Sequence, residues 1–184
     1  MTTITLSPTL LRKARQGFTL VEVMIGAALG SVVLTAVLTT FLFLGRSGAN
    51  IQNYNDMEAQ ARKALEFFAQ DTRQASAITW NSATSVTLIV DSIPVTYSFA
   101  SSTFSRQVSG NTARPIVTGV ISFSFKAFSI TGAELGLGDL AAAGRSTKQL
   151  QISLSASRTT RTAAKATNTV LSARFILRNK RVTT

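Results

Sequence analysis

One acidic residue, Glu22, lies in a long apolar stretch and follows a basic leader. Residues 15–22 read RQGFTLVE, Arg12 and Lys13 precede them, and from Phe18 to Leu44 Glu22 is the one charged side chain. A carboxylate inside a membrane span costs roughly 2.5–3.5 kcal/mol on insertion scales, so such residues are normally functional and paired. Glu22 therefore requires a positive partner, or else it extends to the headgroups at the membrane edge.

The rest of the chain offers little for catalysis. Histidine and cysteine do not occur, which removes the commonest general base and any thiolate chemistry. Seven further acids are scattered or lie on one predicted helix: Asp56, Glu58, Glu66, Asp71, Asp91, Glu134 and Asp139. A Ser or Lys nucleophile would have no evident base beside it, so we expect no catalytic residues, no enzyme activity and no cofactor.

Two of these acids, Glu134 and Asp139, lie in a segment rich in glycine and alanine, TGAELGLGDLAAAG at 131–144. A calcium site needs six or more oxygen ligands, and two acids are too few to provide them. We expect this segment to be a solvated loop without a metal ion.

The chain is basic, with 19 Lys and Arg, 8 Asp and Glu and a formal net charge of +11. Three cations, Arg158, Arg161 and Lys165, lie in the segment 158–168, between two predicted strands. They indicate contact with an anionic partner, which is either an acidic protein subunit or nucleic-acid phosphates, or else a solvated basic surface. The segment has no aromatic residues on which bases could stack, which makes nucleic acid the weakest of these interpretations.

The element that carries Glu22 is a helix that can span a membrane. A helix over residues 18–44 would reach about 40 Å, against about 30 Å for the hydrocarbon core of a bilayer. Apolar positions surround it on all sides, and the basic leader predicts a cytoplasmic N-terminus.

Helical periodicity continues after Gly45 and Gly48. The positions spaced by three and four are Ile51, Tyr54, Met57, Ala61, Ala64, Leu65, Phe68, Thr72 and Ala75, and charged residues, Asp71 among them, fall mostly between them. We predict one long helix, from Phe18 to about Ala77, whose second half buries one face.

Alternating segments predict one antiparallel sheet that covers this face. They are residues 85–91, 93–100, 102–109, 120–130, 148–157 and 170–178. The alternation slips at Ala127-Phe128, where we expect a bulge. The predicted class is α+β.

The N-terminal segment allows three interpretations. A cleaved secretory signal normally has a shorter apolar region, and a plain signal anchor leaves Glu22 unexplained. The third follows from GFTLVE at residues 17–22, which, with its basic leader and apolar continuation, resembles the prepilin signature of type IV pilins and of the pseudopilins of type II secretion.

This resemblance implies roles for individual residues. Prepilin peptidase would cut between Gly17 and Phe18 and methylate the new amine of Phe18. Glu22 would then pair with the N-terminal amine of a neighbouring subunit, which sets the stagger between helices. The implied division is a leader at 1–17, a transmembrane helix at 18–44, its amphipathic continuation at 45–80 and a periplasmic sheet domain at 81–184, in a pilin-like fold.

Further segments indicate which class of pilin or pseudopilin the sequence resembles most. ALEFFAQDTRQA at 64–75 resembles the helix end of J-type minor pseudopilins and W-type minor pilins, and FILRN at 175–179 resembles the last strand of some pseudopilins. Thr39 stands where many major pilins have a proline, and the paired cysteines of many type IV pilins are absent. Both departures favour a pseudopilin or minor pilin over a major subunit.

The sequence thus predicts a minor pseudopilin, anchored once in the inner membrane, with a cytoplasmic N-terminus and a periplasmic domain in a short filament. Its expected partners are other pseudopilins or pilins, prepilin peptidase and the inner-membrane assembly platform. The alternatives are a minor type IV pilin for adhesion, twitching or DNA uptake, and a single-pass anchored protein that never assembles.

Overall fold

The computed structural model describes residues 17–158 and 169–181 and divides the chain into two compact units, residues 1–44 and 45–184. The first helix, α1 (Leu20–Gln74), has 55 residues and contributes to both units. The prediction of one long helix is confirmed, although α1 begins at Leu20 rather than Phe18 and ends at Gln74 rather than near Ala77. Each unit is considered by itself below.

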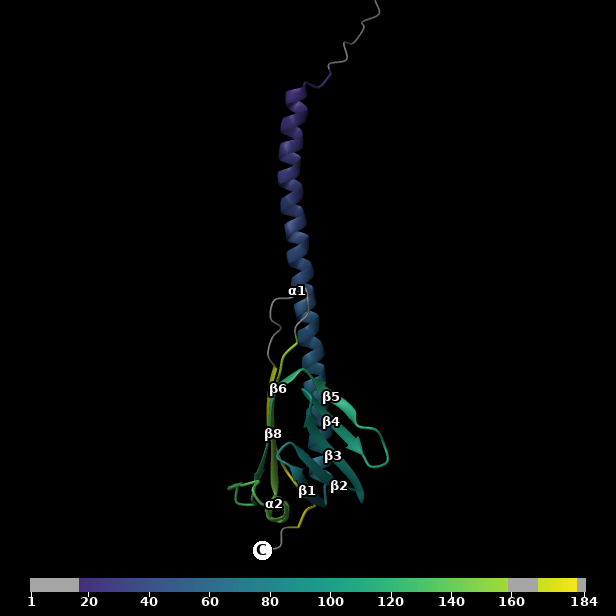
Figure 1. The fold of residues 1–184 in the computed structure, drawn as a ribbon, viewed down its shortest axis with the longest axis vertical. Coiled ribbons are helices and arrows are strands. Elements are labelled where there is room, and N and C mark those ends of the chain that lie inside the picture. The colour runs from purple at the N-terminus through teal and green to yellow at the C-terminus, as the bar shows by residue number, and fades with distance from the viewer. Residues whose placement is uncertain (1–16, 159–168, 182–184) are drawn as a thin grey trace, which may run out of the picture. The chain divides into compact units, whose positions relative to one another are not determined.

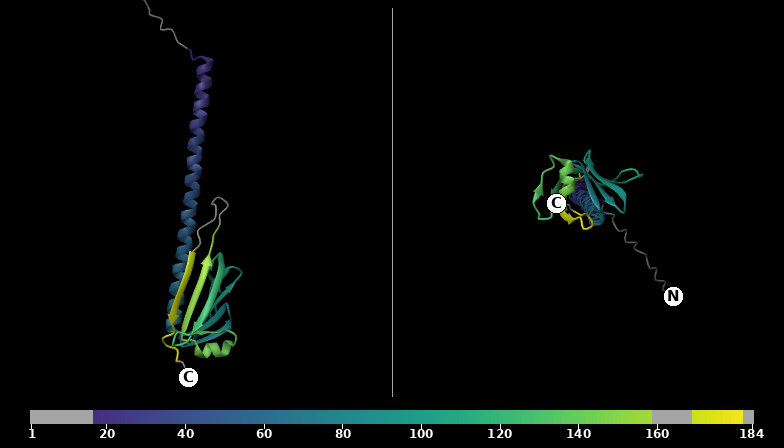
Figure 2. Two further views of the ribbon diagram at one scale, coloured as in Figure 1. Left: turned by 90° about the vertical axis from the view of Figure 1, so that its left-hand side faces the viewer. Right: turned by 90° about the horizontal axis from the view of Figure 1, so that it is seen from below.

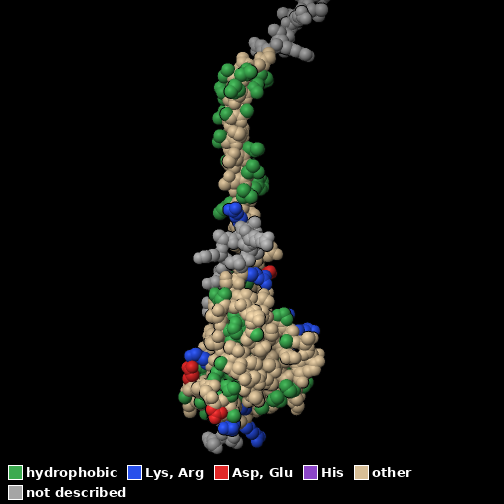
Figure 3. All heavy atoms as spheres, in the orientation of Figure 1, with side chains coloured by type: hydrophobic (Ala, Val, Ile, Leu, Met, Phe, Trp, Pro, Cys, Tyr) green, Lys and Arg blue, Asp and Glu red, His purple; other side chains and the backbone are tan. Residues whose placement is uncertain are grey.

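In the first unit the described part of α1 exposes its apolar side chains all round, and Figure 3 shows them in green. Within the described residues, α1 is the one helix long and apolar enough to cross a membrane. The hydroxyls of Ser31, Thr35, Thr39 and Thr40 donate to carbonyl oxygens three or four residues earlier, at 2.7–3.0 Å. Because the helix satisfies its own hydroxyls, they can enter hydrocarbon at a reduced cost.

In the second unit, α1 buries one face of its remaining length. Met57, Ala61, Ala64, Phe68 and Thr72 are buried at helical spacing, as predicted. The predicted face was too wide at its start, because Ile51 and Tyr54 are exposed. The prediction that Asp71 lies outside the buried face was also wrong, because its side chain is buried.

The first sheet has five antiparallel strands in the order β1-β2-β3-β4-β5. They are β1 (Ala77–Ser82), β2 (Ser85–Val90), β3 (Ile93–Ala100), β4 (Thr103–Val108) and β5 (Arg114–Thr118). Residues at positive φ turn two of the hairpins, Asp91-Ser92 between β2 and β3 and Ser101-Ser102 between β3 and β4. Paired residues of this kind match the right-handed twist of the strands they join.

The second sheet is also antiparallel, in the order β7-β6-β8-β9. Its strands are β6 (Val120–Phe128), β7 (Glu134–Leu135), β8 (Gln149–Ala156) and β9 (Thr169–Ile176), and α2 (Leu140–Ser146) lies between β7 and β8 in the chain. The six predicted strands correspond to β2, β3, β4, β6, β8 and β9. The single predicted sheet is in fact two, because the chain moves from β5 directly into a different sheet at Gly119.

Two local predictions in the second sheet were wrong. Segment 131–144 is not only loop, since it contains β7 and most of α2. The register shift of β6 lies between Val120 and Ser122, whereas Ala127 and Phe128 pair regularly with β8. Phe128 disturbs the alternation because it lies outside the main core, with the guanidinium of Arg174 3.5 Å from the centre of its ring.

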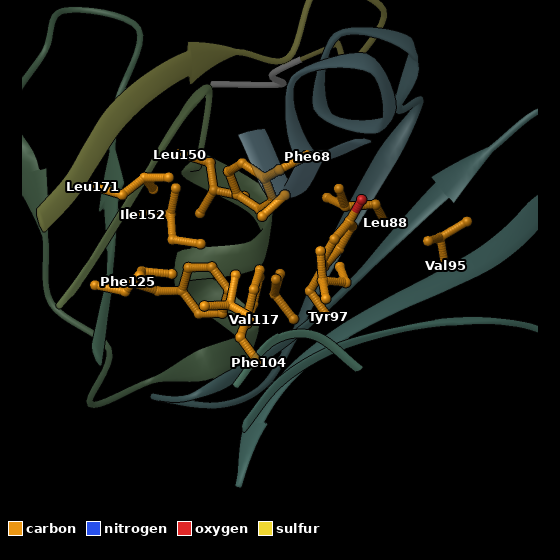
Figure 4. Close-up of a cluster of buried hydrophobic side chains, with 14 of the residues drawn as sticks. Phe68, Leu88, Val95, Tyr97, Phe104, Val117, Phe125, Leu150, Ile152 and Leu171 are labelled. Atoms are coloured by element: carbon orange, nitrogen blue, oxygen red, sulfur yellow. The ribbon is translucent and has the colours of Figure 1, made fainter. Parts of the chain in front are cut away.

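The two sheets and the second half of α1 enclose one core. Seen from below, the sheets flank the helix, and β9 runs beside it (Figure 2). The Phe68 ring lies 5.2 Å from the Tyr97 ring of the first sheet and 5.9 Å from the Phe125 ring of the second, measured between centroids. Figure 4 shows Phe68 from α1 above the side chains of both sheets, among them Leu88, Tyr97, Phe104, Phe125 and Ile152.

Candidate functional site at the start of the long helix

The peptide bond between Gly17 and Phe18 lies just before α1. Residues 17–19 have no regular secondary structure, and Phe18 is 87% exposed. A peptidase binds its substrate in an extended form, and a helical bond would have to unwind first. The part of the chain that the structure describes, from Gly17 onwards, therefore leaves this bond accessible.

Glu22 has local partners that the sequence analysis missed. Its carboxylate accepts hydrogen bonds from the backbone N–H of Thr19 at 2.8 Å and from the Thr19 hydroxyl at 2.9 Å. The Thr19 hydroxyl oxygen in turn accepts from the backbone N–H of Glu22 at 3.2 Å. This reciprocal arrangement is a capping box, in which Thr19 caps the helix and Glu22 occupies its third position.

The capping box was readable from the sequence, because Thr19 and Glu22 have the T-x-x-E spacing before an apolar run. It gives Glu22 a role that needs no second subunit. The carboxylate also lies at the positive end of the helix dipole, which favours a negative charge. Glu22 can therefore shape the helix start in a lone chain and still retain its charge.

Of the basic residues that were predicted to contact partners or to form the leader, the structure describes only Arg158. Arg158 donates to the Asp56 carboxylate at 3.2 Å and to the Thr118 hydroxyl at 3.4 Å, so part of its charge is already balanced. Arg161 and Lys165, like the leader residues Arg12, Lys13 and Arg15, lie outside the described residues.

Both acids weighed as cation ligands have protein partners. Glu134 pairs with Lys126 at 3.1 Å, and Asp139 caps α2 by accepting from the backbone N–H of Ala142 at 2.9 Å. Among the described residues, no cluster of three or more acids is placed to hold a metal ion. These two side chains therefore have structural roles in the chain.

A second polar cluster is buried where α1 meets the first sheet. The Asp71 carboxylate accepts from the Tyr97 hydroxyl at 2.6 Å and from two nitrogens of Arg106 at 2.7 and 3.1 Å. Burial raises the pKa of Tyr97, and the nearby Asp71 charge raises it further. The hydrogen bond to Asp71 raises the pKa of Arg106. The sequence did not show this cluster, because its members lie 26 and 35 positions from Asp71.

A buried lysine secures the C-terminal segment. The Lys180 amine donates to the carbonyl of Arg145 at 2.6 Å, and the Lys148 amine donates to the carbonyl of Lys180. Burial lowers the pKa of Lys180, and the charge of Lys148 lowers it further. These contacts tie the segment after β9 to the end of α2 and indicate a structural role for both amines.

Comparison with known families identifies the N-terminal segment. Residues 12–38 match the family model of the prokaryotic N-terminal methylation motif, and no curated protein matches the chain. This motif implies processing by prepilin peptidase and assembly with other pilins, and it points to a structural subunit rather than an enzyme. Together with the apolar helix that follows it, the motif supports single-pass anchoring in the inner membrane. The motif, together with the long helix packed on antiparallel sheets, supports a place for this chain in the type IV pilin and pseudopilin superfamily.

Proposed function

We propose that the chain is a minor pseudopilin, a structural subunit of the periplasmic filament of a type II secretion system. Residues 1–17 form the leader, and prepilin peptidase cuts between Gly17 and Phe18 and methylates the amine of Phe18. Arg12, Lys13 and Arg15 hold the leader on the cytoplasmic side. Residues 18–44 anchor the subunit and enter the filament core, and the domain at 81–184 contacts other subunits or cargo in the periplasm.

The observation that carries this proposal is the position of Glu22 relative to the cut. Cleavage creates an amine at Phe18, one helical turn before Glu22. In an assembled filament the carboxylate of one subunit can meet the amine of the next, so that two charges costly in hydrocarbon neutralise each other. Before assembly, the backbone N–H and the hydroxyl of Thr19 donate hydrogen bonds to the same carboxylate. These bonds lower the free-energy cost of keeping its charge in the membrane.

A minor type IV pilin is the second candidate, because the motif is shared by both classes. Two features support the pseudopilin over a pilus subunit. The chain has no cysteine for the disulfide of many pilins, and α1 continues as helix through Thr39, where many major pilins have proline. The DNA-uptake version receives no support from Arg158, whose nearest charged partner is Asp56 of its own chain.

Two substitutions at Glu22 separate its charge from its capping role. Glu22→Gln keeps a hydrogen-bond acceptor at the third helical position, which a capping box accepts, but removes the charge. Glu22→Ala removes both. We expect both variants to be processed normally and both to fail to enter filaments, because assembly requires the charge.

Mass spectrometry of the N-terminus and the amount of subunit in sheared filaments provide the two readouts. Wild-type protein should begin with methylated Phe18, and an unprocessed or differently processed start would reject the pilin-like assignment of the cut. If Glu22→Gln assembles as well as the wild type while Glu22→Ala does not, Glu22 acts only through the capping box, and the charge-pair proposal is wrong.

A further inference from the structure

A groove with a basic lining opens in the second unit between α1 and the first sheet. Its volume is about 680 Å³, and α1, β4, β5 and the loop between the two strands line it. Figure 1 shows β4 and β5 beside this part of α1. Four of its lining residues are cationic, namely Lys63, Arg106, Arg114 and Arg158, and none is acidic. The groove is remote in sequence from the methylation motif.

The four cations differ in how far the chain already neutralises them. Arg106 is bound to the buried Asp71, and Arg158 is paired with Asp56. Lys63 and Arg114 are exposed, and no carboxylate of the described residues lies within ion-pair distance of either. These two side chains therefore provide the unbalanced positive charge of the groove.

Apolar surface lies between the charged groups. Phe67 and Val108 are half-buried, Ile116 is buried, and all three line the groove. The Lys63 amine and the Arg106 guanidinium lie 5.7 and 5.3 Å from the centre of the Phe67 ring. The amide of Gln60 and the hydroxyl of Thr118 add hydrogen-bonding groups beside these apolar side chains. A ligand that fits must therefore offer both negative charge and apolar contact.

We propose that this groove binds an extended, acidic segment of a partner protein, with carboxylates against Lys63 and Arg114 and an apolar side chain on Phe67. Carboxylates meet arginine and lysine through charge-assisted hydrogen bonds. An extended segment that carries both acidic and apolar side chains can offer both kinds of group to one channel. Charge complementarity of this kind sets partner choice and association rate.

A nucleic acid fits the same groove less well. Single-stranded nucleic acids bind where aromatic faces are free to stack on bases and cations follow the backbone. Phe67 is the one aromatic residue among the described residues that line the groove, so successive bases would have only a single ring to stack on. A phosphate backbone would also leave the apolar surface of Ile116 and Val108 without a partner.

The test uses the full chain in nanodiscs of phosphatidylcholine, because anionic lipids would compete for the cations. The probe is a fluorescent peptide in which glutamate alternates with leucine and serine, and its binding is followed by anisotropy at low salt. A peptide with glutamine in place of glutamate and a single-stranded oligonucleotide are run in parallel. The groove variant is Lys63→Glu with Arg114→Glu. The matched control is Arg178→Glu with Arg181→Glu, which makes the same change in net charge at exposed residues that do not line the groove.

We expect the groove variant to raise the Kd of the acidic peptide by about tenfold or more and the control to change it by less than about twofold. The glutamine peptide should bind weakly to every form. Equal losses in both variants would mean that net charge alone attracts the peptide, and would overturn the proposal. So would oligonucleotide binding that depends on Lys63 and Arg114 while the acidic peptide does not bind. Because neither readout involves cleavage or assembly, this result is independent of the role of Glu22.

Discussion

At the scale of single residues, Glu22 has a local role in the lone chain and a second role in the proposed filament. In the lone chain its carboxylate completes a capping box with Thr19. In the proposed filament a positive amine would add a charge–charge attraction to this carboxylate, which the neutral donors of Thr19 cannot supply. The hydrogen bonds from Thr19 therefore lower the free-energy cost of the charge in the membrane, and the amine of a neighbouring subunit would still stabilise this charge further.

Asp71 is the other acidic residue whose surroundings decide its role. Its side chain is 6% exposed, and it accepts from Tyr97 and Arg106 of neighbouring strands. These bonds tie the end of α1 to β3 and β4. A buried carboxylate with all its partners present holds the helix at one register against the sheet.

We predict that Asp71→Ala lowers the free energy of unfolding of the second unit by about 2–4 kcal/mol, because the Tyr97 hydroxyl and the Arg106 guanidinium lose their acceptor. Thermal unfolding of the full chain in detergent, followed by circular dichroism, should show a fall of roughly 5–15 °C. The control is Glu58→Ala, which breaks the exposed Glu58–Arg62 pair and should change the melting temperature little. Equal shifts for both variants would show that Asp71 contributes no more than a surface acid.

At the scale of elements, α1 meets two different surroundings along its length. Its first part is apolar all round and satisfies its own hydroxyls, as a helix in lipid must. Its second part buries one face at a spacing of three and four against strands, as a helix in water does. α1 is therefore one continuous helix, although its two parts are helical for different physical reasons.

The junction between the two sheets depends on one glycine. Gly119 has φ of +73°, and a Cβ added there would lie 2.5 Å from the carbonyl oxygen of Ser157. This close approach accompanies a backbone hydrogen bond of 2.8 Å from the Ser157 N–H to the Gly119 carbonyl. The chain can leave β5 and enter β6 at this point because glycine has no side chain.

We predict that Gly119→Ala destabilises the second unit by about 2 kcal/mol or more, because it adds a backbone clash to the strain of positive φ. Gly110→Ala is the matched control, since Gly110 has φ of +82° but open space around it, and it should cost only about 1 kcal/mol. Urea unfolding of both full-length variants would measure the difference. A smaller effect at Gly119 than at Gly110 would contradict the importance of the close approach.

At the scale of the whole second unit, Phe68 joins three layers. It is fully buried, and its ring contacts Tyr97 of the first sheet and Phe125 and Phe175 of the second. The two sheets also contact each other directly through Phe104 and Phe125, so the helix and both sheets share one core, which makes the fold of this unit cooperative.

We predict that Phe68→Ala destabilises the second unit by about 3–5 kcal/mol, because it leaves a cavity where the sheets meet the helix. The neighbouring Phe67→Ala is the control, since Phe67 is only half-buried at the rim of the groove, and its loss should cost clearly less. Denaturant unfolding of the two variants would compare them. If Phe67→Ala were as damaging as Phe68→Ala, the core would extend further towards the groove than the burial of these two rings indicates.

Much of the fold could be predicted, and the misses have physical causes. The period of the apolar residues identified the second half of α1 and six strands, because these elements bury apolar residues on one face, and the uninterrupted apolar run identified the first half of α1. β5 was missed because it is short and contains Pro115, which speaks against a strand, and β1 because only Ile78 and Trp80 mark its buried face. α2 was missed because its few residues are mostly alanine and glycine and show little periodicity.

The N-terminal motif could be recognised from the sequence because its signal is local. The motif is contiguous with the apolar residues that follow it, and the cleavage, methylation and charge-pair roles of Gly17, Phe18 and Glu22 stay predictions. The buried Asp71 cluster, the groove with Lys63 and Arg114, and the division into two sheets depend on residues far apart in the chain. Only tertiary structure decides these, because it is the packing of α1 against the strands that brings such residues together.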